Sequence, residues 1–249
     1  MKQICIILAH PYERSLNAAI ANAAAEKLQN SGYEVKFHDL YKEKFNPILS
    51  GTELVSDESD DELLKAHQKD IANAHGIVIV HPNWWGEPPA ILKGWIDRVL
   101  RQRVAYDFAP GDNGGGLPIG LLKAKAAVVF NTSNTPEARE NEIFGDPLER
   151  IWKSCIFDFC GVKTFERLMF RVVADSDEVE RKVWLEQVAR RRWIGTFRSR
   201  LICFKFENSL LAKSAWRRIL IAYFKQIRAE FARTFGAKSM KFRRQLCLD

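Results

Sequence analysis

The chain has 249 residues, of which 47% are hydrophobic, 28% charged and 11% aromatic. This length and composition suit one or two folded domains and exclude collagen-like, mucin-like and wholly disordered proteins. Five scattered cysteines without a C-x-x-C pair do not form a disulfide framework, which favours a reducing, cytoplasmic compartment. The first apolar run ends at His10 and Pro11, too early to predict a secretory leader or a membrane span.

The net charge of +7 is unevenly distributed. Positions 190–249 carry 16 Lys and Arg against 3 Asp and Glu, a net of +13, which leaves −6 for positions 1–189. The sequence therefore predicts a folded domain over 1–190 and a basic, aromatic-rich extension over 191–249, helical or poorly ordered.

Short apolar runs alternate with helical patterns through the first 190 residues. Strands are predicted at 3–9, 34–40, 76–80, 126–130 and 165–173. Helices are predicted at 15–31, around 63–71, from 89 to about 100, from 147 to about 160, and at 175–189. This alternation indicates an α/β fold with a doubly wound, five-stranded parallel sheet. The glycine-rich stretch 111–120 is predicted to be a surface loop.

In such sheets, ligands bind beyond the carboxyl ends of the strands. Three unusual loops follow predicted strands, and the first two lie at residues 10–17 and 82–86. In the loop 10–17, Ser15 is a good N-cap, and the first-turn amides behind it can bind phosphate. The loop 82–86 places Trp84 and Trp85 side by side. At least one indole is expected to line a cleft, and the other to anchor the core.

A third loop, 131–136, offers hydroxyls and amides that suit the carbonyls and ring nitrogens of a heterocycle. Taken singly, the three loops also fit an ordinary N-cap, two core anchors and a polar turn. Together they predict a phosphate end, an aromatic wall and a polar rim, which is a flavin site.

A resemblance makes this prediction more specific. It rests on His10-Pro11 with Ser15-x-Asn17, on the block WWGEPPAILKGWIDRV over 84–99, and on Ala105-Tyr106. The pattern resembles the NAD(P)H:quinone oxidoreductase (DT-diaphorase-like) family, which has a flavodoxin-like fold, and covers about positions 1–190. The resemblance implies a homodimer that binds FAD, with FMN not excluded, and passes a hydride from NAD(P)H through the flavin to a quinone-like acceptor with ping-pong kinetics.

The resemblance also assigns site residues. It places the flavin phosphate portion at His10, Ser15, Leu16 and Asn17, and the isoalloxazine at Asn83, Trp84, Trp85, Asn131, Thr132, Ser133 and Asn134. It implies that Tyr106 and Phe108 line the acceptor pocket from across a dimer interface.

The sequence departs from the family after the fourth strand. The family's Thr-Thr-Gly-Gly is replaced by the residues 131–134, and the expected tyrosine has no counterpart, Arg139 lying near its place. No catalytic acid or base is therefore assigned. His38 and His67 lack metal-ligand spacing, as does His75, so no metal site is predicted.

Other functions remain open at this point. The domain also suits a flavodoxin-like electron carrier or regulatory subunit without turnover of its own, or a scaffold for a binding protein. The basic extension suits an anionic membrane surface, nucleic acid, or a poorly selected extension without function.

Overall fold

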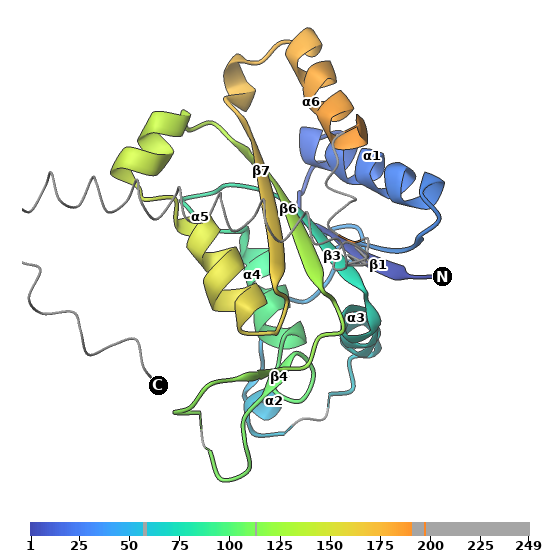
Figure 1. Cartoon of the computed structure of the whole chain (residues 1–249), viewed down its shortest axis with the longest axis vertical. Coiled ribbons are helices and arrows are strands. Elements are labelled where there is room, and N and C mark those ends of the chain that lie inside the picture. Colours follow the sequence, from blue (N-terminus) through green and yellow to red (C-terminus); the bar gives the residue numbers. More distant parts are fainter. Residues whose placement is uncertain (57–58, 113, 191–196, 198–249) are drawn as a thin grey trace, which may run out of the picture. The chain divides into compact units, whose positions relative to one another are not determined.

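The computed structural model describes residues 1–56, 59–112, 114–190 and 197. They contain the predicted five-stranded parallel sheet, in the order β2-β1-β3-β6-β7 (Figure 1). The strands are β1 (Gln3–Leu8), β2 (Glu34–Asp39), β3 (Gly76–Pro82), β6 (Ala126–Ser133) and β7 (Thr164–Arg171). The predicted fold is therefore confirmed, whereas most of the basic extension lies outside the described residues.

The strands alternate their side chains between two cores, one on each face of the sheet. Ile4 and Ile6 of β1 pack with α1 (Leu16–Asn30) and α6 (Glu178–Arg190), and Phe197 is buried in the same cluster. Cys5 and Ile7 face the second core, which is covered by α3 (Glu62–Asn73), α4 (Ala90–Val99), α5 (Pro147–Arg150) and the π-helix η2 (Ile151–Asp158). Packing of the domain thus extends past position 190.

Shorter elements complete the described part of the chain. They are α2 (Gly51–Val55), the π-helix η1 (Arg139–Ile143), the 3-10 helix η3 (Val173–Asp175), and the antiparallel strands β4 (Tyr106–Asp107) and β5 (Ile119–Gly120). The predicted loop 111–120 therefore ends in a strand. Among the described residues, no helix combines the length and apolarity needed to cross a membrane.

The residues Asp146 and Glu149 have the spacing of a capping box at the start of α5, but only half of it is formed. Asp146 accepts a hydrogen bond from the amide of Glu149, as expected of an N-cap. The Glu149 carboxylate accepts from Nε of Arg167 on β7 at 2.9 Å. It is used to hold the helix against the neighbouring strand.

Candidate active site

Three loops leave the carboxyl ends of the adjacent strands β1, β3 and β6. Backbone pairing continues into them, because Ala9 donates to Val80 at 2.9 Å and Asn83 donates to Thr132 at 2.7 Å. The loops therefore begin side by side at one edge of the sheet, as the sequence predicts.

The first loop presents hydrogen-bond donors. The Ser15 side chain accepts a hydrogen bond from the Ala18 amide at 3.1 Å, which confirms Ser15 as the N-cap. The amides of Leu16 and Asn17 lie in the first turn of α1, where no helical carbonyl is placed to accept from them. Burial lowers the pKa of His10, so its imidazole is neutral near pH 7. Its Nδ1 lies 3.1 Å from the Tyr12 amide nitrogen, which can only donate, and 3.3 Å from the Tyr12 carbonyl oxygen. We assign the shorter contact as the hydrogen bond, which places the ring proton on Nε2 as a donor. These groups suit a phosphate.

The second loop forms a tight turn. Trp84 and Glu87 exchange backbone hydrogen bonds of 3.1 and 3.0 Å around Trp85 and Gly86, whose φ values are 58° and 77°. Two left-handed central residues make this a type I′ hairpin turn. Trp84 is 43% exposed and Trp85 fully exposed, so the prediction that one of them anchors the core is wrong. The Trp84 ring lies 6.4 Å from the His10 ring, between centroids.

Side-chain hydrogen bonds tie the third loop to its neighbours. Asn17 donates to Oγ1 of Thr132 at 2.8 Å, joining the first and third loops. Asn134 accepts from the Ala174 amide at 2.9 Å, and Ser133 accepts from the amide two residues on at 3.0 Å. The polar groups predicted to surround a flavin ring therefore also hold the loops in place.

Asn131 lies inside the protein, beside a buried histidine. Its amide nitrogen is 2.9 Å from Nε2 of His81, which also accepts from the Trp152 indole at 2.9 Å. His81 Nδ1 donates to the carbonyl of Pro82 at 2.8 Å. Burial lowers the pKa of His81 to about 4, so the ring stays neutral near pH 7. Both side chains are enclosed, and they fix the ends of β3 and β6.

Tyr106 and Phe108 lie away from these loops. They form an aromatic cluster with Phe159, whose ring centroid is 4.7 Å from that of Tyr106 and 6.2 Å from that of Phe108. Phe159 precedes β7, so the cluster lies near the amino end of that strand (Figure 1). Within one chain, the predicted acceptor residues and the three loops are not brought together.

A polar pocket of about 410 Å³ lies along β7, at the edge of the sheet. It is lined by Arg167 and Arg171 and by the carboxylates of Glu137, Asp146 and Glu149, among others. Arg171 is paired in register with Ser133, so the pocket adjoins the third loop. No pattern in the sequence singles out these arginines, because charged residues on a strand carry no distinctive spacing.

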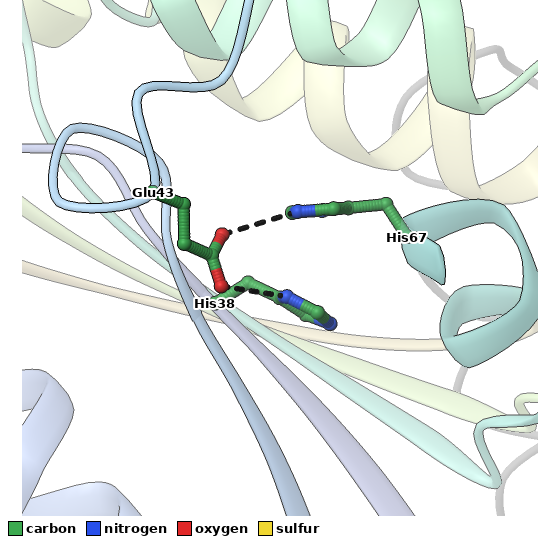
Figure 2. A group of neighbouring side chains, drawn as sticks. All are labelled: His38, Glu43 and His67. Atoms are coloured by element: carbon green, nitrogen blue, oxygen red, sulfur yellow. Dashed lines mark hydrogen bonds and ion pairs between the residues drawn. The ribbon is translucent and has the colours of Figure 1, made fainter. Parts of the chain in front are cut away.

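His38 and His67, which are 29 residues apart in the sequence, lie side by side in the structure. Glu43 lies between them, with Oε1 3.1 Å from Nδ1 of His38 and Oε2 3.1 Å from Nε2 of His67 (Figure 2). His38 Nε2 also lies 3.2 Å from the Asp70 carboxylate. Two imidazoles and a carboxylate within 4.8 Å of one another are of the types that bind a divalent cation.

The hydrogen bond from Trp95 argues against a cation in this cluster. The Trp95 indole donates to Nδ1 of His67 at 2.9 Å, and an indole N–H can only donate. Nδ1 therefore keeps its lone pair and Nε2, facing Glu43, carries the proton. A metal at Nε2 would require an imidazolate. We interpret the cluster as a proton-bearing network that ties α3 and α4 to the loop after β2.

The three-loop edge fits a flavin. Among the described residues, Oδ1 of Asn17, Oδ1 of Asn131 and Oε1 of Glu140 are buried without a hydrogen-bond partner. Donors at the N-terminus of α1 and two exposed indoles lie at this edge, whereas the Asn131 and Glu140 side chains are enclosed behind it and do not face a ligand. Glu140 was not predicted, since it is one of several acidic residues in a polar stretch.

The strand order and the ligand edge define the class of α/β proteins that bind nucleotides and flavins at the switch point of the sheet. Residues 2–192 match the sequence model of the flavodoxin-like fold family. The chain therefore belongs to that family.

Relatives share most of this domain. The chain is 36% identical over 195 residues to an uncharacterised NAD(P)H oxidoreductase of Haemophilus influenzae, covering 75% of this chain and 92% of that protein. It is 29% identical over 187 residues to NAD(P)H dehydrogenase (quinone) 1 of Rattus norvegicus, covering 67% of each. A solved NAD(P)H:quinone oxidoreductase of Methanothermobacter marburgensis has a similar fold, with 24% identity, TM-score 0.65, and coverage of 76% of this chain and 94% of that one.

Proposed function

We propose that this chain is a flavin-dependent NAD(P)H oxidoreductase that reduces a quinone or similar flat acceptor by two electrons in a ping-pong cycle. The observation that carries the proposal is the arrangement of three loops at one edge of the sheet, which are tied to each other by hydrogen bonds. The first loop offers hydrogen-bond donors that suit a phosphate, and the second offers two exposed indoles. The names of the relatives support the same activity.

Each part of the edge has a role in this proposal. The amides of Leu16 and Asn17 and Nε2–H of His10 bind the phosphate, aided by the positive end of the α1 dipole. Trp84 and Trp85 flank the ring and exclude water from one side of it. Backbone amides of loop 131–134 stabilise negative charge that develops there. Flavin, when bound, supplies the hydride chemistry that no side chain here can provide.

The finer features of the proposal are FAD as cofactor, a homodimer and a cytoplasmic location. The family resemblance favours FAD. The family resemblance also implies the dimer: Tyr106 and Phe108 pack with Phe159 and not with the three loops, so a second copy would have to bring these rings to the first copy's flavin. Cys5, Cys155 and Cys160 are free thiols, in keeping with a reducing compartment.

A visible absorption spectrum tests the proposal. Purified protein is expected to show flavin absorption that bleaches on adding NADH or NADPH and returns with a quinone. A flavin spectrum that neither nucleotide bleaches would instead support an electron carrier. Colourless protein that binds neither FAD nor FMN would contradict the proposal and favour a scaffold. Chromatography of the released cofactor then distinguishes FAD from FMN.

A further inference from the structure

The buried carboxyl group of Glu140 lies next to the turn that carries the two tryptophans. We propose that Glu140 is a positioning residue for the flavin site: through Asn83, it holds the turn 84–87 in the conformation that presents both indoles to a planar ligand. This inference rests on the proposed function and adds a residue that does not itself touch the ligand.

The turn needs support from outside. A type I′ turn requires φ > 0 at both central positions, which asparagine and glycine adopt readily, whereas here the first position is a tryptophan at φ 58°. Packing does not hold that residue, because the Trp85 side chain is fully exposed. Besides its own two backbone hydrogen bonds and the close approach of Gly86 to Pro147, the turn is held by side-chain hydrogen bonds from Asn83.

Asn83 supplies these hydrogen bonds. Its Oδ1 accepts from the Gly86 amide at 3.0 Å, inside the turn. Because a backbone amide can only donate, the asparagine oxygen must face Gly86 and its Nδ2 must face the other way. Nδ2 donates to Oε2 of Glu140 at 3.1 Å. The orientation of the Asn83 amide therefore depends on an acceptor at position 140.

Glu140 cannot move away from this contact. It is fully buried in η1, where its amide donates to the Pro136 carbonyl at 3.1 Å and its own carbonyl accepts from the Asp146 amide at 2.9 Å. The contact spans 57 residues of sequence and joins the loop after β3 to the segment after β6. Glu140 thus fixes the spacing between two of the three loops.

Three substitutions test this role. Glu140→Gln keeps an acceptor for Nδ2, Glu140→Leu removes it at similar volume, and Glu142→Leu is the control, in the same π-helix but exposed. For apoprotein titrated with FAD and with FMN, we expect Kd to rise about tenfold or more in E140L. We expect E140Q and E142L to stay within about threefold of the wild type.

A second readout separates positioning from loss of folding. Thermal unfolding and circular dichroism check that each variant is folded. The emission of Trp85 is obtained as the difference between each protein and the same protein carrying W85F. We expect iodide quenching of this emission to change in E140L and to stay unchanged in E140Q. The KM for the nicotinamide donor is expected to rise more than kcat falls. In the double variant N83L/E140L, the loss of affinity is expected to be smaller than the sum of the losses in N83L and E140L, because the two residues share one contact.

Several results would overturn the inference. A folded E140L with wild-type flavin affinity and quenching would do so, as would E140Q losing as much affinity as E140L, or additive losses in the double variant. If the wild type binds no flavin, the proposed function fails. The quenching comparison then still decides whether Glu140 shapes the turn.

Discussion

Removal of the Glu43 carboxylate is expected to destabilise the domain in a pH-dependent way. Burial raises the pKa of Glu43, but the hydrogen bonds that its carboxylate accepts from His38 and His67 outweigh burial and lower the pKa from 4.5 to about 2. This lowering of the pKa corresponds to about 3 kcal/mol. Because 28% of the Glu43 side chain is exposed, solvent screening reduces this free energy to about 2 kcal/mol.

The sign follows from linkage. A depressed carboxyl pKa contributes stability that is present above pH 4.5 and is lost as the pH falls from 4.5 towards 2. Urea unfolding of the wild type and Glu43→Gln should therefore differ by about 2 kcal/mol at pH 7, by less than half of that at pH 3, and converge below about pH 2. Glu34→Gln, at an exposed ion pair with Lys36, is the control and should change stability by less than about 0.5 kcal/mol. A difference at pH 3 as large as at pH 7 would refute this reasoning.

Three further predictions concern other contacts. Trp95→Phe removes the donor to Nδ1 of His67, so Zn²⁺ should raise the Tm of this variant by several degrees and leave the wild type unchanged; a wild-type shift would contradict the assigned proton. Gly94→Ala would place a Cβ 2.1 Å from the Pro47 carbonyl, so we expect a loss of about 1–3 kcal/mol in urea unfolding, and equal stability would contradict this close approach. Trp85→Ala should change the free energy of unfolding by less than about 0.5 kcal/mol, because the side chain is exposed, but should raise the KM for the acceptor in steady-state assays. An unchanged KM would contradict the proposal that this indole lines the acceptor site.

The fold is predictable from the sequence because its signals are local. Runs such as 76–80 are apolar at every position, as strands covered on both faces must be, and the four-residue spacing of Ile91, Trp95 and Val99 gives α4 its buried face. Ser15 is recognisable as an N-cap for the same reason. The position of the ligand edge then follows from the topology.

The details of the site depend on contacts between residues distant in sequence. The backbone of Trp85 has a positive φ, and its indole points outward; a Trp-Gly pair in the sequence does not predict this conformation. Glu43 meets its two histidines from separate elements, and Glu140 is buried although it lies among exposed acidic residues. No periodicity links these residues, so only the three-dimensional arrangement reveals them.

The central claim is that the three loops hold a flavin, and a crystal structure of the protein soaked with FAD tests it most directly. We predict electron density for the tricyclic ring against Trp84 and Trp85, with a phosphate at the amides of Leu16 and Asn17. Ring density elsewhere, such as in the polar pocket along β7, or loops that stay empty at saturating FAD, would contradict the claim.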